Sequence, residues 1–385
     1  MRVLVTNTRL ADRTGTELYV LDLATALLER GFTPIAFSPV LGEVALQLRA
    51  AGVLVVDDLS VVQVPPDVIH GHHSLETMTA LLAFPGVPAV SFCHSWRAWQ
   101  DAPPRFPRIF RYVGVDHTCA DRLLVENGIP EPQVRVILNF VDLARFRSRG
   151  PLPPRPQRAL VFSNYATEQA PVAAVRRACQ QAGITLDVVG TKWGNEAERP
   201  EDVLGRYDLI FAKARAALEA LAVGAAVVVC DAGGVGPMVT TENLEQLRKL
   251  NFGVRALRKP ISAGVLQHEI ARYDALDAAE VSRRVRASAG RDAAVDEIIA
   301  LYEEVIAEHR GGPPDDLHAE SRAAAAYLRS LAPLLIERDL LQAFLRKAVR
   351  VPVLGWALRS TLRGAAALSR GGRRFSDVLK VLEED

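Results

Sequence analysis

The sequence lacks the features of a disulfide-bonded, zinc-binding or membrane-spanning protein. No two cysteines have the close spacing that structural zinc sites and dithiol centres require. No run of about 18 apolar residues is present, so no segment is long enough to cross a bilayer. The first residues are too polar to form a secretion signal. We therefore expect a cytoplasmic protein with four reduced, buried thiols: Cys93, Cys119, Cys179 and Cys230.

Net charge is also nearly absent. The 385 residues include 46 lysines and arginines against 45 aspartates and glutamates, which leaves a formal charge of +1. The chain as a whole therefore gives no electrostatic reason to expect nucleic acid as a partner. What is present is a globular composition, 49% hydrophobic and 24% charged, in a length that suffices for two domains.

Short apolar runs alternate with helical patterns in the first part of the chain. The run at 2–6 (RVLVT) predicts a strand, and leucines at helical spacing predict a helix from Glu17 to Arg30 that ends before Gly31. Further strands are expected near 34–37, 53–56, 67–70 and 87–95, with helices between them. This order is typical of a parallel sheet covered by helices on both faces.

The alternation stops and then restarts. Residues 147–157 are rich in proline and arginine without apolar periodicity, which predicts a linker, and RALVF at 158–162 begins a second series. We therefore predict an α/β fold with Rossmann-like βαβ domains over 1–146 and 158–311, a linker over 147–157 and a helical extension over 312–385. Ligands of open parallel sheets bind beyond the carboxyl ends of the strands, so we expect the site in a cleft between the domains.

The first candidate for a site is the loop after the first strand. Gly15 and Thr16 open a predicted helix, and backbone N–H groups at a helix N-terminus bind anions. Glu17, in contrast, is also explained as a favourable acid in a first helical turn. The loop is therefore either a phosphate or acceptor site, or a helix start with ordinary capping.

The second candidate is the helix ARAALEALAVG at 214–224. Glu219 is its single acid, and a buried carboxylate is costly unless it is paired, so Glu219 either faces solvent or meets a polar ligand. Lys213 and Arg215 stand at the start of the helix, directly after a strand. They can reach a diphosphate there, or they belong to a solvated helix end.

The third candidate follows the most apolar strand of the chain, AAVVVCD at 225–231. Asp231 ends this strand, and Gly233, Gly234 and Val235 continue into a glycine-rich segment. Glycines at a strand end let the backbone approach a ligand closely, and a flexible turn explains them as well.

Histidines gather at His70, His72 and His73, with His94 at the end of a later strand. The adjacent His72 and His73 do not share a face, and no cysteine or carboxylate completes a ligand set, so no metal is expected. His94 is of more interest, because an imidazole facing the cleft can position or deprotonate an acceptor hydroxyl. Packing or internal hydrogen bonding is the alternative explanation of His94.

The segment 341–375 differs from the rest of the chain, with eight arginines and lysines and no acid. Such a segment can lie on anionic lipid, which predicts a peripheral membrane contact on the inner face of the membrane. Packing of a helical appendage on the body or on a second subunit is the alternative. No pattern indicates an oligomeric state.

Several stretches together resemble the retaining GT-B glycosyltransferases of family 4, over about residues 1–310. The most specific is FAKARAALEALAVGAAVVVCDAGGVGPMV (211–239), which is similar to the family's donor-binding helix, the next strand and a glycine-rich loop. Residues 9–32 resemble the first loop and helix, and VRVILNFVDLARF (134–146) resembles the end of the N-terminal domain. The resemblance implies the GT-B architecture, in which two Rossmann-like domains face a central cleft.

The resemblance also implies roles for individual residues. Glu219 corresponds to the glutamate that hydrogen-bonds the ribose of the donor nucleotide, and His94 matches a histidine near the donor sugar. The segment Asp231–Gly236 would lie near the sugar and the diphosphate. Gly15 would shape the loop near the phosphates.

Two positions depart from the family. Phe211 stands where the family has a glutamate, and residues 162–172 contain neither the arginine nor the lysine that neutralises the leaving diphosphate. We expect Lys213 and Arg215 to supply this charge from another loop.

The expected function is transfer of a sugar from a nucleotide-diphosphate-sugar donor to a hydroxyl acceptor, with retention of configuration and without a metal or other cofactor. The acceptor would be a glycan, a glycolipid or a metabolite. Two alternatives stay open, a nucleotide-sugar epimerase on the same architecture and a non-catalytic homologue that binds the nucleotide sugar. Phe211 favours the second of these.

Overall fold

The computed structural model describes residues 1–349, which divide into two compact units at Asp315 and Asp316. The second unit contains the helix α12 (Leu317–Val349), which includes Pro333. The segment predicted to contact lipid is 341–375. Its residues from 350 onward lie outside the described residues. Within the described part of the chain, no helix is long and apolar enough to cross a membrane.

The first unit begins with a parallel sheet of seven strands in the order β3-β2-β1-β4-β5-β6-β7. Its strands are β1 (Arg2–Thr6), β2 (Thr33–Phe37), β3 (Leu54–Val56), β4 (Val68–His72), β5 (Ala89–Cys93), β6 (Ile109–Gly114) and β7 (Val134–Val136). Its helices are α1 (Gly15–Glu29), α2 (Glu43–Ala50), α3 (Ser74–Ala83) and α4 (His117–Asp121). The apolar run at 2–6 forms the central strand β1, where Val3, Leu4 and Val5 are fully buried.

The second sheet of this unit has five strands in the order β12-β11-β10-β8-β9. Its strands are β8 (Arg158–Phe162), β9 (Thr185–Val189), β10 (Leu209–Ala212), β11 (Ala226–Asp231) and β12 (Gly234–Met238). Its helices are α5 (Val172–Gln181), α6 (Pro200–Leu204), α7 (Ala214–Val223), α8 (Leu244–Lys249), α9 (Ala263–Ile270) and α10 (Ala275–Ser288). The helix α11 (Arg291–Gly311) then returns to the first sheet and packs on α1.

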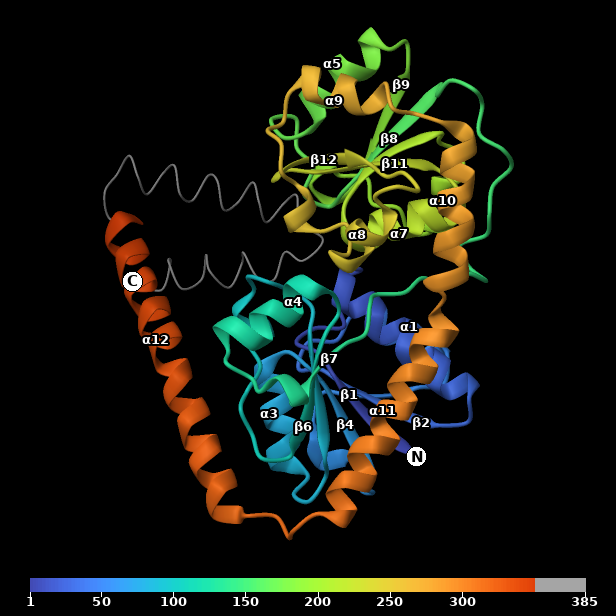
Figure 1. Ribbon diagram of the computed structural model, residues 1–385. Helices are drawn as coiled ribbons and strands as arrows, with labels where there is room; N and C mark the ends of the chain where they lie inside the picture. Colours follow the sequence, from blue (N-terminus) through green and yellow to red (C-terminus); the bar gives the residue numbers. More distant parts are fainter. Residues whose placement is uncertain (350–385) are drawn as a thin grey trace. The chain divides into compact units, whose positions relative to one another are not determined.

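Both sheets are covered on their two faces, as predicted (Figure 1). Helices α3 and α4 pack on one face of the first sheet, and α1 and α11 pack on the other. In the second sheet, alternate residues of β11 enter two separate cores. Val227 and Val229 pack in the core on the side of α7, whereas Val228 and Cys230 pack in the core on the side of α5. Burial of both faces explains why this strand is apolar throughout rather than alternating.

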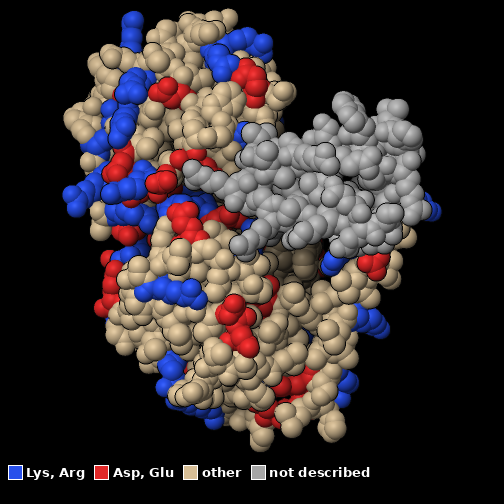
Figure 2. Space-filling model, turned by 180° about the vertical axis from the view of Figure 1, so that it is seen from behind, with Lys and Arg blue, Asp and Glu red and all other residues tan. Residues whose placement is uncertain are grey.

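The predicted α/β architecture of two Rossmann-like βαβ sheets is therefore confirmed. Gly31 has a φ of 78° after α1, and Gly224 has a φ of 100° after α7, so both helices end at the glycines expected to end them. The four cysteines are free and buried, as expected. Basic and acidic side chains lie beside one another on the face shown in Figure 2.

The glycine-rich segment after β11 was predicted as a loop, and this was wrong. It forms the antiparallel strand β12, in which Gly234 pairs with Asp231. The outer edge of β12 also pairs with backbone, because Val235 and Lys259 exchange two hydrogen bonds of 2.9 Å. A Cβ atom at Gly236 would lie only 2.7 Å from the carbonyl oxygen of Ala256. These glycines are therefore explained by the close approach of neighbouring backbone.

Candidate functional site

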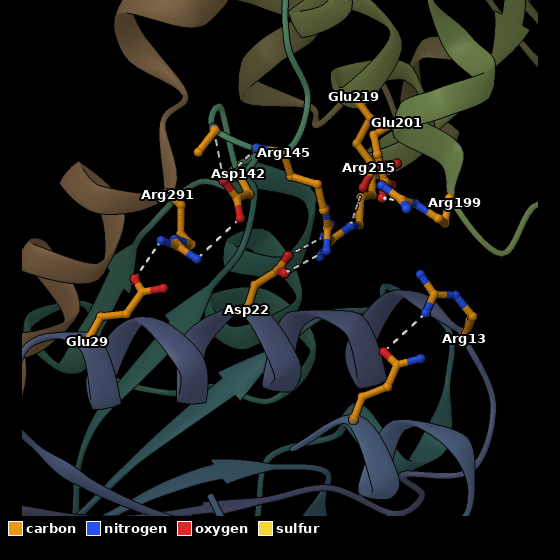
Figure 3. A network of polar contacts seen from close by, with 12 residues as sticks. Arg13, Asp22, Glu29, Asp142, Arg145, Arg199, Glu201, Arg215, Glu219 and Arg291 are labelled. Carbon is orange, nitrogen blue, oxygen red and sulfur yellow. Dashed lines mark hydrogen bonds and ion pairs between the residues drawn. The ribbon is translucent and has the colours of Figure 1, made fainter. Parts of the chain in front are cut away.

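Glu219 lies on the buried side of α7, with 5% of its surface exposed. Its Oε1 accepts a 2.7 Å hydrogen bond from Nε of Arg215, one turn earlier on the same helix. Arg215 also forms an ion pair with Asp22 (Figure 3). Asp22 lies on α1, which packs on the first sheet. Burial raises the pKa of Glu219, although the guanidinium of Arg215 acts in the opposite direction. The predicted ribose-binding carboxylate is thus held in place by a neighbouring cation.

Arg215 is fully engaged by these two acids. Burial disfavours its charged form, but the carboxylates of Asp22 and Glu219 outweigh this effect and raise the pKa of Arg215. Asp22 receives a second cation from the segment that follows β7, because Nη1 of Arg145 lies 3.4 Å from its Oδ1. The guanidinium of Arg215 was predicted to reach a diphosphate, and the structure instead places it in a contact between the two sheets.

A second group of ion pairs lies at the C-terminal end of α1 (Figure 3). Arg291, the first residue of α11, forms ion pairs of 2.7 Å with Glu29 and 3.3 Å with Asp142. Asp142 lies in the segment between β7 and β8, and Arg291 follows the helices of the second sheet, so this group of side chains lies where the chain passes twice between the two sheets. The helix α1 is therefore bound to residues far along the chain at its middle, through Asp22, and at its C-terminal end, through Glu29.

Lys213 and Asp231 meet at the carboxyl edge of the second sheet. The ammonium group of Lys213, which immediately follows β10, forms an ion pair with Oδ2 of Asp231 at the end of β11. Oδ1 of Asp231 accepts a 2.7 Å hydrogen bond from the hydroxyl of Ser163, which follows β8. Three adjacent strands thus end in one polar cluster, at the edge where open sheets bind ligands.

The structure gives a physical reason for the absence of a glutamate at position 211. Phe211 lies inside β10 and is fully buried in the core. A single residue, Lys213, separates β10 from α7, so the connection here is too short to form a loop that would project a carboxylate. The turn is tight enough to place Ala214 at a φ of 53°, which is unfavourable for a residue with a Cβ atom.

The glycine-rich residues differ in their accessibility. Val235 is fully buried in the core against α5 and α9, so its side chain is not available to a ligand. Gly234 is also buried, and a Cβ there would lie 3.1 Å from the carbonyl oxygen of Lys259. Gly233, in the turn between β11 and β12, is exposed beside Asp231. Gly233 is thus the exposed one of these three predicted ligand-binding residues.

The first loop is organised by Glu17, which is 2% exposed. Its Oε1 accepts hydrogen bonds from the backbone N–H groups of Ala11 and Asp12, both 3.1 Å, and its Oε2 accepts one from Thr14 at 3.0 Å. The carboxylate therefore occupies three donors that an anionic ligand would otherwise contact. Gly15 and Thr16 form the first turn of α1 beyond these bonds.

His94 follows β5 and packs within a group of rings. Its imidazole centroid lies 4.5 Å from that of His72 and 4.8 Å from that of Tyr19. Burial lowers the pKa of His94 to about 3, assisted by His73 and Arg215, so the ring is neutral near pH 7. Its Nε2 has no hydrogen-bond partner among residues 1–349. A neutral imidazole in this position can donate or accept a hydrogen bond, but it is a weak base.

The other histidines take separate roles. His70 and His72 lie on the same side of β4, and Nδ1 of His70 meets the hydroxyl of Tyr302 on α11. His73 points elsewhere, and its Nδ1 accepts a 3.1 Å hydrogen bond from the backbone of Thr8. No group of three or more metal-binding side chains with suitable placement is found in the described part of the chain.

The sequence did not indicate the residues that support this site. Asp101 accepts a 2.9 Å hydrogen bond from the backbone N–H of His94 and so fixes the end of β5. Burial raises the pKa of Asp101 to about 6. Asp22 looks in the sequence like an ordinary helix acid, and its partner Arg215 is far along the chain. The one signal in the sequence for the burial of Asp22 is its position on the same face of α1 as the buried apolar residues.

A cavity of about 280 Å³ lies apart from these residues. Nη2 of Arg248 donates to the carbonyl of Asn139 there, and burial lowers the pKa of Arg248 to about 10. None of the residues predicted for donor binding lines this cavity. Its lining consists of Val136, Leu138, Phe140, Arg248, Ser288, Ala289, Gly290, Ala293, Ala294 and Glu297.

Comparison with known proteins agrees with this architecture. Residues 59–145 match the model of Glycosyltransferase Family 4. No curated protein sequence matches the chain. A glycosyltransferase from Rickettsia africae has the same fold, with a TM-score of 0.57 and 14% identity over 79% of this chain and 98% of its own.

Two further solved structures are similar. The HepE protein of Anabaena, solved in complex with UDP and glucose, has a TM-score of 0.57 and 13% identity over 79% of this chain and 100% of its own. The sucrose-phosphate synthase of Thermosynechococcus elongatus has a TM-score of 0.55 and 13% identity over 80% of this chain and 99% of its own. The fold is therefore the GT-B fold, and the predicted resemblance to family 4 is confirmed.

Proposed function

We propose that this chain transfers a sugar from a nucleotide-diphosphate-sugar donor to a hydroxyl acceptor, with retention of configuration. The observation that carries the proposal is the placement of Glu219. It is the single carboxylate on the buried side of α7, beside the carboxyl edge of the second sheet, in the stretch that resembles the family's donor-binding helix. Similarity to a protein solved with UDP and glucose supports the class of donor.

The side chains of the site suit this reaction. Glu219 would accept hydrogen bonds from the ribose hydroxyls, while Arg215 holds its carboxylate in position. Lys213 would place a positive charge near the departing diphosphate, where charge develops during transfer. His94, being neutral, would orient a hydroxyl rather than remove its proton. Catalysis would come from positioning and from stabilisation of the leaving group.

A non-catalytic, nucleotide-sugar-binding role is the second candidate. The core position of Phe211 and the one-residue connection before α7 favour it, because they remove a carboxylate that the family carries. The proposal includes three further predictions. The reaction needs no metal, the protein is cytoplasmic, and the segment 341–375 contacts lipid. The acceptor would be a glycan, a glycolipid or a metabolite.

Nucleotide binding tests the proposal first. Thermal unfolding is measured with UDP, GDP, ADP and their sugar conjugates, for the wild type and for Glu219→Gln. A ligand at a hundred times its Kd should add about 2.7 kcal/mol to the free energy of unfolding. The exposed Glu245 on α8 gives the matched control, since Glu245→Gln removes one carboxylate away from the site.

The outcomes separate the candidates. Stabilisation by one nucleotide diphosphate that Glu219→Gln loses and Glu245→Gln keeps supports the donor site. Incubation with the matching nucleotide sugar then distinguishes transfer or hydrolysis from binding alone, and a product with an inverted sugar centre and an intact diphosphate identifies an epimerase. If no nucleotide stabilises the wild type, the proposed function is wrong.

A further inference from the structure

Two ammonium groups converge on one exposed aromatic ring at the carboxyl edge of the second sheet. Nζ of Lys213 lies 5.4 Å from the ring centroid of Tyr165, and Nζ of Lys192 lies 5.8 Å from it. Tyr165 is 59% exposed. The three residues follow β10, β9 and β8, which are neighbours in the sheet, so the strand order itself brings them together.

The backbone holds the loops after β8 and β9 against each other. Asn164 accepts hydrogen bonds from Thr191 and Lys192, of 3.3 Å to its side chain and 3.4 Å to its carbonyl oxygen. At Gly190, an added Cβ would lie 1.9 Å from the carbonyl oxygen of Ser163, so a residue with a side chain does not fit. The loop that carries Lys192 is therefore fixed beside the loop that carries Tyr165.

The same cluster continues to Lys213. The backbone N–H of Tyr165 donates to the hydroxyl of Ser163 at 3.1 Å, and that hydroxyl donates to Asp231 at 2.7 Å. Asp231 in turn pairs with the ammonium group of Lys213. A continuous set of hydrogen bonds thus positions both the ring and one of the two cations.

The charges of this cluster are unequal. Lys213 has a carboxylate partner, whereas no ion pair of Lys192 is found among residues 1–349. Both ammonium groups carry a positive charge beside the same ring, and an anion bound at this ring would be attracted by both. Arg215 does not supply this charge, because Asp22 and Glu219 already engage it.

We propose that Lys192, together with Lys213, binds the diphosphate of the nucleotide donor, and that the ring of Tyr165 holds the two ammonium groups in position. This inference rests on the proposed function and deepens it. The family resemblance places cations in the loop after β8, but this loop carries Tyr165 instead. The cations Lys213 and Lys192 follow the neighbouring strands β10 and β9. Lys192 is then a binding residue that neutralises the leaving nucleoside diphosphate, in place of Arg215.

The experiment compares Lys192→Gln with the wild type by isothermal titration calorimetry. The probes are the nucleoside diphosphate that stabilises the wild type and the corresponding nucleoside without phosphates. Lys192→Gln should bind the diphosphate at least tenfold more weakly and the nucleoside with unchanged affinity. Lys192→Arg, which keeps the charge, should restore most of the affinity. Lys249→Gln is the control, because Lys249 is also exposed but lies on α8.

Lys192 is exposed, so the variants should fold, and an unchanged midpoint of thermal unfolding without ligand verifies this. Equal diphosphate affinity in Lys192→Gln and the wild type would overturn the inference and leave the proposed function intact. An equal loss for diphosphate and nucleoside would also overturn it, since the residue would then act on loop structure rather than on phosphate charge. A wild type that binds none of the nucleoside diphosphates would overturn both.

Discussion

Arg215 of α7 and Asp22 of α1 form an ion pair that joins helices on the two different sheets. The side chain of Asp22 is 4% exposed and that of Arg215 is 14% exposed, so the pair is largely removed from water. Because Arg215 also holds Glu219, the position of the proposed ribose-binding carboxylate depends on a residue of the other sheet. The contact between the sheets and the proposed donor site are therefore physically connected.

Replacement of Asp22 tests this connection. Asp22→Asn leaves Arg145 and Arg215 near a neutral amide, and removal of one partner from a buried ion pair costs about 3–5 kcal/mol. We expect the free energy of unfolding to fall by about 3 kcal/mol, measured by urea denaturation. Asp12→Asn is the control, because Asp12 forms an exposed pair with Arg9 that is worth under about 1 kcal/mol. A similar small loss for both variants would contradict the assigned importance of the buried pair.

The first loop offers a second test. Glu17 accepts three backbone hydrogen bonds, from Ala11, Asp12 and Thr14. Glu17→Gln keeps the shape but replaces one acceptor oxygen with a donor, which faces backbone N–H groups. We expect a loss of about 1–3 kcal/mol in the free energy of unfolding, the range for a buried polar group left without its partner. Faster hydrogen exchange at residues 11–14 would locate the effect, whereas unchanged exchange there would show that the loop is held by other contacts.

The fold could be predicted from the sequence because each element carries its own local pattern. The apolar run of β11, the helical spacing in α1 and the glycines Gly31 and Gly224 are signals within a few residues. The strand β12 was not predictable in the same way, because glycines suit both a loop and a strand that is packed between other backbone segments. The distinction depends on Lys259 and Ala256, which approach only in the folded chain.

The site was predictable in part for the same reason. Glu219 lies on a helix whose pattern is visible. Lys213 and Asp231 stand at the ends of strands whose patterns are equally visible, so their meeting at a sheet edge could be expected. The engagement of Arg215 could not, since its partner Asp22 is 193 residues away. The proposed contribution of Lys192 depends on the strand order β10-β8-β9, which no local pattern encodes.

Asp101 predicts a pH dependence of stability. Burial raises its pKa from 3.8 to about 6, so between these values the folded chain keeps a proton that the unfolded chain has lost. Stability therefore falls as the pH rises from about 4 to about 6 and does not change further through this group above that range. The shift corresponds to at most about 3 kcal/mol, at 1.36 kcal/mol for each pKa unit.

Urea denaturation of the wild type and Asp101→Asn at pH 4, 5, 6 and 7 checks this prediction. The stability of the wild type relative to the variant should decline up to about pH 6 and then stay level. Asp58→Asn gives a control of opposite sign, because hydrogen bonds from Ser60 lower the pKa of the exposed Asp58. For Asp58, the wild type should lose stability relative to the variant as the pH falls. A relative stability that does not change with pH for Asp101→Asn would show that its carboxyl is ionised as easily as in water.

The last prediction concerns the protonation of His94. Burial lowers its pKa to about 3, with His73 and Arg215 adding to the effect, so the ring should remain neutral from pH 5 to pH 9. In an NMR titration, the His94 imidazole signals should not shift over this range. If the proposed transfer reaction is observed, His94→Gln should keep a hydrogen-bonding group and lose less than about 100-fold in kcat, below the usual cost of removing a general base. A titration of His94 near pH 6–7, together with a larger loss and a changed pH profile in His94→Gln, would instead assign proton abstraction to this residue.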